Sequence, residues 1–192
     1  MRTASISRKT NETDIKLTIN LDGTGKHSIS TGIGFFDHML TAFSVHSGID
    51  IELTVVGDLV VDGHHTVEDT GIALGQAFAL ALGNKAGITR YGTAFIPMDE
   101  ALGFASLDIS GRPFLVFQCK FHDPKTGDYD NCLTEEFFRA FAMNSLITLH
   151  ASCGYGNNDH HKNEALFKAV AHALKNALKI NGTEVLSSKG VL

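Results

Sequence analysis

The chain has 192 residues, of which 43% are hydrophobic and 19% charged, and a formal net charge of −5. This length is enough for one large domain or two half-domains with a buried core, and no apolar run or signal segment marks a membrane or secreted protein, so we expect a cytoplasmic location. The acidic balance argues against general nucleic-acid binding, and the three cysteines lack the spacing of a disulfide framework or a thiolate metal site.

The first half of the chain predicts the order strand, strand, helix, strand, helix. Alternating apolar residues indicate strands at 3–9 and 14–21, and Glu12 falls at their junction, where a carboxylate can face a cleft. The residues after the turn at 31–34 fit a helix of about ten to thirteen residues, by the same periodicity. A strand at 49–56 and a helix at 66–82, ended by Gly83, complete this half.

The second half repeats this order of elements. The segments 91–97, 101–109 and 113–121 are typical of strands, and 133–149 is mainly helical in pattern. After a polar turn, the amphipathic spacing of residues 161–180 predicts a second long helix in this half. The repeated order suggests that the two halves are related by duplication.

A histidine pair followed three residues later by glutamate occurs once in each half. His64-His65 precedes Glu68, and His160-His161 precedes Glu164. On a helix, residues three and four apart share a face, so each copy can direct imidazole and carboxylate groups the same way. Two such faces predict a metal site.

A ligand-type residue also lies on the helix before each pair. When the pairs are aligned with a two-residue length difference, His38 falls on Glu136. We therefore expect His38 to complete the first half-site and Glu136 the second. An alternative interpretation, that the pairs are ordinary surface or helix-terminal histidines, is weakened because two copies stand in equivalent places.

The candidate ligands are all imidazole or carboxylate groups, without a thiolate. This set suits a borderline or hard divalent ion such as manganese, iron or zinc, and the number of ligands would serve two ions. The glutamates do not occupy the position of the base in an H-E-x-x-H metalloprotease motif. The proposed ligands are His38, His64, His65, Glu68, Glu136, His160, His161 and Glu164.

Several further motifs stand in a fixed order along the chain. They are TGIGFFDHML (31–40), DGHHTVED (62–69), PMDEAL (97–102), SGRP (110–113), NDHH (158–161) with Glu164-Ala165 and Phe167-Lys168-Ala169, and SKGVL (188–192). This ordered set closely resembles the imidazoleglycerol-phosphate dehydratase family, and the resemblance extends from Arg8 to the last residue.

The resemblance implies an α+β fold, a two-layer α/β sandwich of the ribosomal protein S5 domain 2-like type. Within a single domain of residues 1–192, two repeats at approximately 1–86 and 87–192 would each pack a four-stranded mixed sheet on two helices. It also implies a homo-oligomer of 24 subunits with active sites where subunits meet, two manganese ions per site, and neither a nucleic-acid nor a membrane partner.

The implied reaction is dehydration of D-erythro-imidazole glycerol phosphate to imidazole acetol phosphate in histidine biosynthesis, through a metal-bound imidazolate and a diazafulvene-like intermediate. The resemblance assigns proton transfer to Glu12 and metal binding to the eight ligands above. Position 136 departs from the family pattern, because many members have His there. The residues expected to hold the phosphate are Arg90, Arg112, Lys168, Ser187, Ser188 and Lys189.

Two other functions remain open from the residues themselves. One is a different di-metal enzyme on the same scaffold, such as a phosphate-ester hydrolase that uses metal-bound hydroxide. The other is a non-enzymatic metal-binding or assembly protein, which the basic and serine residues make a weaker alternative.

Overall fold

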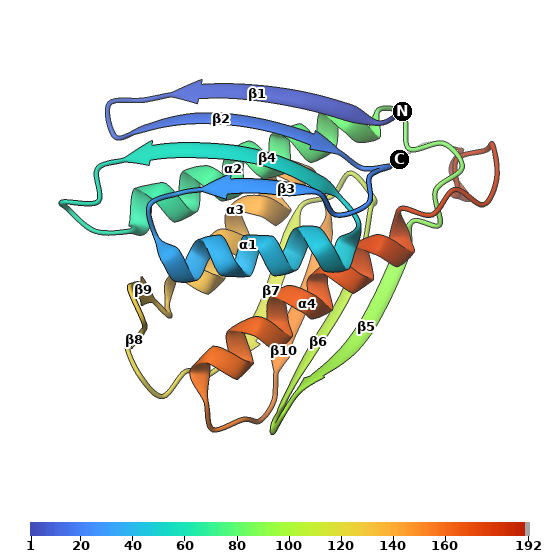
Figure 1. The fold of residues 1–192 in the computed structure, drawn as a ribbon. Helices are drawn as coiled ribbons and strands as arrows, with labels where there is room; N and C mark the ends of the chain where they lie inside the picture. The colour runs from blue at the N-terminus through green and yellow to red at the C-terminus, as the bar shows by residue number, and fades with distance from the viewer. Residues whose placement is uncertain (191–192) are drawn as a thin grey trace.

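The computed structural model describes residues 1–190, and Val191 and Leu192 of the last motif lie outside them. The first half contains β1 (Thr3–Lys9), β2 (Thr13–Asn20), β3 (His27–Ser30), α1 (Gly34–Ser47), β4 (Asp50–Gly57) and α2 (His64–Leu82) (Figure 1). The second half contains β5 (Tyr91–Met98), β6 (Ala101–Asp108), β7 (Phe114–Cys119), β8 (Lys125–Thr126), β9 (Tyr129–Asp130), α3 (Leu133–Ser145), β10 (Thr148–Cys153) and α4 (Asp159–Ala177).

The two four-stranded sheets have the same topology. The strand orders are β1-β2-β4-β3 and β5-β6-β10-β7, so each strand of one sheet has a counterpart in the other. In both sheets the first three strands pair antiparallel, and the last edge strand pairs parallel to its neighbour. This confirms the predicted α+β fold with duplicated halves.

Each sheet buries one face against helices. In β2, Ile15, Leu17 and Ile19 are buried while the residues between them are partly or fully exposed, which is the alternation expected of a strand covered on one side. The corresponding strand β6 buries Ala105 and Leu107 in the same way. The inward side chains of both sheets join one continuous core.

The helices pair across the two halves. Helix α1 packs against α4, and α2 packs against α3. Two glycines of α2, Gly71 and Gly75, allow this helix to approach α3 closely. A Cβ added at Gly71 would lie 2.8 Å from the carbonyl oxygen of Phe137, and a Cβ added at Gly75 would lie 2.7 Å from the carbonyl oxygen of Phe141. Each half thus depends on a helix from the other.

The predicted helix over 133–149 is wrong at its C-terminal end. Helix α3 ends at Ser145, and Leu146 adopts a left-handed conformation with φ of 57°. Strand β10 then begins at Thr148, with buried Leu149, Ala151 and Cys153 alternating with outward residues. The apolar residues of the helix and strand follow one another without a Gly or Pro, so sequence periodicity did not separate them.

The remaining predicted elements are confirmed, with small shifts of their ends. The sequence did not predict the short edge strand β3 or the β8–β9 hairpin, because elements of four or two residues carry too little periodicity. No helix among residues 1–190 is long and apolar enough to cross a bilayer.

Candidate metal centre

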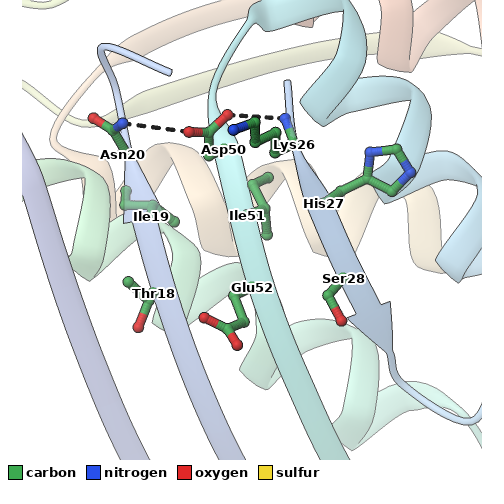
Figure 2. Close-up of a pocket in the computed structure, with 9 residues that line it drawn as sticks. All are labelled: Thr18, Ile19, Asn20, Lys26, His27, Ser28, Asp50, Ile51 and Glu52. Carbon is green, nitrogen blue, oxygen red and sulfur yellow. Dashed lines mark hydrogen bonds between the residues drawn. The ribbon is translucent and has the colours of Figure 1, made fainter. Parts of the chain in front are cut away.

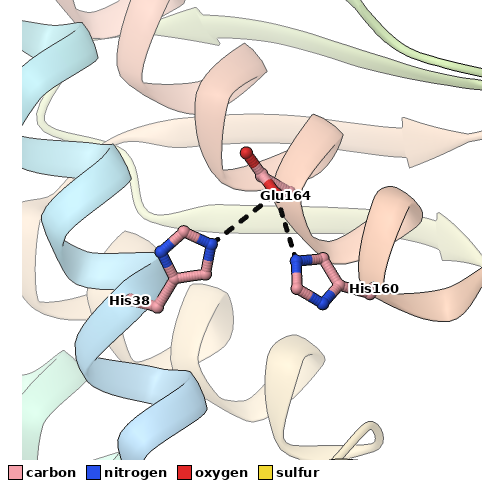
Figure 3. A group of neighbouring side chains, drawn as sticks. All are labelled: His38, His160 and Glu164. Atoms are coloured by element: carbon pink, nitrogen blue, oxygen red, sulfur yellow. Dashed lines mark ion pairs between the residues drawn. The ribbon is translucent and has the colours of Figure 1, made fainter.

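Three proposed ligands converge between α1 and α4. His38 comes from α1, and His160 and Glu164 come from α4 (Figure 3). The Nε2 atoms of His160 and His38 lie 3.2 Å and 3.6 Å from Oε2 of Glu164. One ligand atom from each residue lies within 4.8 Å of the others, which makes this cluster a candidate site for a metal ion.

Local sequence on α4 orients two of these ligands. The side chain of Asn158 caps the helix by accepting hydrogen bonds from the backbone N–H groups of His160, at 2.9 Å, and His161, at 3.4 Å. His160 and Glu164 are four residues apart and therefore lie on one face. The cap and the spacing together place the imidazole beside the carboxylate.

The Glu164 carboxylate is charged although its side chain is only 11% exposed. Burial works to raise the pKa of Glu164, but the hydrogen bond from Lys168, at 2.6 Å, and the nearby His38 and His160 outweigh burial and hold that pKa below its ordinary value. A charged carboxylate beside two imidazoles is a suitable set of ligands for a divalent ion.

The expectation that His38 completes the first half-site is wrong within one chain, because α1 packs on α4 and brings His38 to the second histidine pair. His64 lies 3.6 Å from Glu68 on α2. Glu136 lies beside Arg139, with its Oε2 3.7 Å from Nε. Across residues 1–190, His64 and Glu68 form no three-ligand cluster with Glu136.

The second histidine of each pair is supported in the same way in both halves. Nδ1 of His65 lies 3.0 Å from Asp58, and Nδ1 of His161 lies 2.7 Å from Glu100. These hydrogen bonds raise the pKa of both imidazoles, and the bond to His161, with the N–H groups of Asn158 and Asn157, lowers the pKa of Glu100 to about 2. With Nδ1 engaged as a donor, Nε2 is the nitrogen left to bind a metal.

The supporting roles of Asp58 and Glu100 were not predicted from the sequence. Asp58 directly follows β4, and Glu100 lies in the turn between β5 and β6. Their partners are seven and 61 residues away along the chain, so only the fold brings each carboxylate to its histidine. The acidic PMDEAL motif was the one signal that included Glu100.

Glu12 lies at the β1–β2 turn, as its position in the sequence predicts. Its backbone N–H donates to Oγ1 of Thr10, and its carboxylate Oε1 lies 3.6 Å from Nε2 of His65. Asp99, in the corresponding β5–β6 turn, lies 3.6 Å from Nε2 of His161. The exposed Glu12 carboxylate is therefore beside a proposed ligand and open to a substrate.

Two of the residues predicted to hold phosphate, Arg90 and Arg112, lie against Asp108. Arg90 donates two hydrogen bonds to this carboxylate, at 2.7 Å and 3.0 Å, and one to the carbonyl oxygen of Leu186, at 2.6 Å. The more exposed Arg112 lies 3.4 Å from Asp108. Arg90 thus holds the segment that continues to Ser187, Ser188 and Lys189, whereas Lys168 lies apart from it, on Glu164.

The arginine cluster and the His161 surroundings lie at opposite ends of one hairpin. Arg90 precedes β5, and Asp99 and Glu100 follow it. An eight-residue strand spans about 26 Å at the usual ~3.3 Å per residue. A small substrate therefore cannot contact both ends within one chain.

A pocket elsewhere in the structure lies over β2, β4 and β3 (Figure 2). Asp50 forms its polar edge by accepting hydrogen bonds from the backbone N–H groups of Thr24 and Lys26, both at 2.8 Å, and from Asn20 at 3.3 Å. None of the eight proposed metal ligands lines this pocket, so it does not coincide with the candidate metal centre.

Comparison with known proteins gives one consistent family. The family model described as imidazoleglycerol-phosphate dehydratase matches residues 31–174. The chain is 57% identical over 192 residues to the imidazoleglycerol-phosphate dehydratase of Methanosarcina barkeri, covering 100% of both chains, and 56% identical over 191 residues to that of an Exiguobacterium species, covering 99% and 98%.

Solved structures give the same result. The crystal structure of imidazoleglycerol-phosphate dehydratase from Staphylococcus aureus is similar with a TM-score of 0.85 and 40% sequence identity, covering 93% of this chain and 99% of that one. The corresponding structure from Pyrococcus furiosus gives a TM-score of 0.84 and 38% identity, covering 97% and 100%. Sequence and fold are therefore similar to the same enzymes over nearly their whole length.

Proposed function

Because this chain belongs to the imidazoleglycerol-phosphate dehydratase family and is a hydro-lyase of histidine biosynthesis, we propose that it works with two Mn²⁺ ions per active site. The substrate is D-erythro-imidazole glycerol phosphate and the product imidazole acetol phosphate. The observation that carries the metal proposal is the convergence of His38, His160 and Glu164.

The donor groups fit manganese. Imidazole and carboxylate ligands without a thiolate suit borderline or hard divalent ions. His38, His160 and Glu164 supply one set, to which His65 and His161 add imidazoles whose Nδ1 atoms are already held by carboxylates. His64, Glu68 and Glu136 are assigned to the remaining positions, and the acidic Glu136 would add negative charge where many relatives have a neutral imidazole.

The difficulty of the reaction is that the proton to be removed is on a carbon that is not acidic. Ions held by these residues would supply Lewis-acid stabilisation of the deprotonated substrate imidazole, which would help the hydroxyl group to leave. The proton on the neighbouring carbon then becomes acidic enough for a carboxylate.

Glu12 is the proton-transfer residue in this mechanism. Its carboxylate lies at an exposed turn and 3.6 Å from Nε2 of His65, so it is positioned beside one proposed ligand rather than buried away from substrate. A carboxylate held in this way can take the carbon proton once the hydroxyl group has left.

The phosphate group would be bound by residues that present N–H and O–H donors. Guanidinium groups bind phosphate oxygens bidentately, and binding energy from this remote group can hold the imidazole ring in place for the reaction. The assigned residues are Arg90, Arg112, Lys168, Ser187, Ser188 and Lys189. In the free chain, Asp108 keeps the two arginines near each other.

A complete active site would form between subunits. The roughly 26 Å between the arginine cluster and the His161 surroundings exceeds the reach of one small substrate, so a second chain must supply one of the two groups. A closed 24-subunit assembly would repeat such a contact symmetrically. A cytoplasmic location remains part of this proposal.

The decisive experiment is a product assay on metal-stripped protein. We expect the ketone product to disappear after chelation and to return when Mn²⁺ is added, with no release of inorganic phosphate at any stage. Activity that survives stripping would contradict the metal mechanism. Release of inorganic phosphate would instead favour a phosphate-ester hydrolase.

A further inference from the structure

The connection between β7 and α3 is much longer than its counterpart in the first half. Residues 120–132 join β7 to α3, whereas residues 31–33 join β3 to α1. The longer connection, which we name the bridging segment (residues 120–132), contains the β8–β9 hairpin. It is therefore a feature of the second half that duplication alone does not explain.

The bridging segment is fixed to α4 through polar residues of that helix. Asp159 accepts hydrogen bonds from the backbone N–H groups of His122, at 2.8 Å, and Asp123, at 2.7 Å. Asn163 directly precedes Glu164 in the sequence and is fully buried. Its side chain donates a hydrogen bond to Asn131 at 2.9 Å. Buried polar contacts of this kind hold one arrangement, because breaking them leaves unpaired groups.

The same segment also holds the first turn of α1. Oδ2 of Asp128 accepts a hydrogen bond from the N–H of Gly34, at 2.6 Å, and Oδ1 accepts one from Phe35, at 3.0 Å. Burial opposes the charge on Asp128, but these N–H groups outweigh it and lower the pKa of its carboxyl. The carboxylate also lies at the positive end of the helix.

The N-cap residue of helix α1 does not cap the helix with its side chain. This residue is Ile33, and the first residue of the helix is Gly34, a weak helix former. In contrast, α4 is capped by the side chain of Asn158, the residue directly before the helix. Asp37 within α1 binds Thr31 before the helix, and Asp128, from 94 residues away, accepts hydrogen bonds from the first two N–H groups of α1.

An aromatic contact continues from the bridging segment to the metal centre. The ring of Phe35 lies between those of Tyr129 and His160, with centroids 5.6 Å and 5.0 Å away. His38 follows one turn later on α1, and its ring centroid is 5.7 Å from that of His160. The bridging segment thus connects both helices that carry the cluster.

From these contacts we infer that Asp128 is a positioning residue for the metal centre, because it fixes the start of α1 and so sets His38 against His160 and Glu164. This inference rests on the proposed function. Asp128 does not touch the three ligands, and its effect passes through Gly34, Phe35 and the helix they begin. Outer residues that orient metal ligands typically change affinity about 10- to 100-fold.

The test compares Asp128→Ala with Asp50→Ala. Asp50 is a matched control, because its carboxylate also accepts two backbone N–H bonds in the first half but lies away from the metal centre. Mn²⁺ binding is followed by electron paramagnetic resonance titration without substrate, and circular dichroism checks the fold. We expect Asp128→Ala to weaken Mn²⁺ binding about tenfold and Asp50→Ala to change it less than about twofold.

Asp128→Asn provides a second, milder variant. Its amide retains one carbonyl oxygen, so we expect a smaller loss of affinity than in Asp128→Ala, and this variant decides the test if Asp128→Ala does not fold. Wild-type binding in either Asp128 variant that folds would overturn the inference, as would an equal loss in Asp50→Ala. Wild-type protein that binds no Mn²⁺ would instead contradict the proposed function.

Discussion

The half-sites on α4 and α2 share their spacing and are packed by corresponding helices, α1 and α3, but their side chains make different contacts. On α4, Glu164 is nearly buried, paired with Lys168, and approached by His38 from α1. On α2, the Glu68 side chain is 44% exposed and lies near His64. The repeated sequence determines the pair itself, whereas the contact of a third ligand depends on the side chain at position 38 or 136, because His38 approaches Glu164 and Glu136 lies beside Arg139.

The second histidines show the opposite behaviour, because their surroundings are alike in both halves. Asp58 and Glu100 hold Nδ1 of His65 and His161, and Glu12 and Asp99 lie at equal distances from the two Nε2 atoms. Glu12 and Asp99 come from the corresponding β1–β2 and β5–β6 turns, whereas Asp58 follows β4 and Glu100 lies in the β5–β6 turn. The two halves therefore make the same histidine contacts with one carboxylate from an equivalent position and one from a different position.

The largest expected effect is that of Glu12→Gln on turnover. Removing the proton-transfer carboxylate should lower kcat by about 10²- to 10⁴-fold while the amide keeps the shape of the side chain. Manganese content and oligomer size should stay unchanged, as measured by elemental analysis and light scattering. Near-normal turnover would remove Glu12 from its proposed role.

Changing the second histidines should affect metal binding directly. His65→Ala and His161→Ala each delete a proposed ligand, so Mn²⁺ affinity should fall by more than the ~10- to 100-fold loss typical of an outer partner. Metal content after dialysis against a range of Mn²⁺ concentrations measures this loss. Unchanged manganese stoichiometry in both variants would refute the ligand assignment and the similarity of the two halves.

Weakening the supporting carboxylates should have a smaller effect. Asp58→Asn and Glu100→Gln leave both imidazoles in place but remove the charge that orients them, so we predict a loss of about tenfold in Mn²⁺ affinity for each. Calorimetric titration provides the measurement. Asp14→Asn, which alters an exposed pair with Lys9, is the control and should bind normally.

The smallest expected effect concerns a histidine pair at the other end of α1 and α4. Nδ1 of His46 lies 3.1 Å from Nε2 of His172. Burial lowers the pKa of both imidazoles below the ordinary 6.5, and the charge of His172 lowers the pKa of His46 further. As the pH falls below about 6.5, the unfolded chain takes up protons first. The two neutral histidines therefore leave the free energy of unfolding at its full value above that pH, and this free energy decreases below it.

His172→Gln tests this difference between the helix pairs. Under the repeat, His46 and His172 correspond to Asn144 and Gln76, which do not titrate. The variant should lose less thermal stability than wild type between about pH 7.5 and about pH 5.5, as measured by calorimetry. An equal pH dependence in both proteins would show that the pair does not contribute.

Sequence reasoning predicted what is encoded by short-range spacing. The alternation in β2 and the helical spacing after His64 and His160 predicted the strands and helices, and the equivalent histidine pairs predicted the duplication. The order of motifs identified the family, which the comparisons confirm.

Long-range contacts could not be predicted in the same way. Nothing near His38 in sequence indicates that α1 packs on α4 rather than beside the first histidine pair. Asp58, Glu100 and Asp128 act on partners brought to them by turns and strand ends, and the chain around them resembles ordinary polar loop sequence. Their roles become visible only when strand order and helix packing are known.

The packing of α1 against α4 also has a consequence for the order in which the protein folds during translation. His46 and His172 are 126 residues apart, so α1 leaves the ribosome on the order of ten seconds before its partner at ~5–20 residues per second. Until then Met39, Leu40 and Phe43 lack their full covering, and the ligands of the cluster belong to separate parts of the chain. The candidate metal centre therefore cannot form before the last helix is synthesised, and a nascent first half has to avoid aggregation without the contacts of α1 with α4.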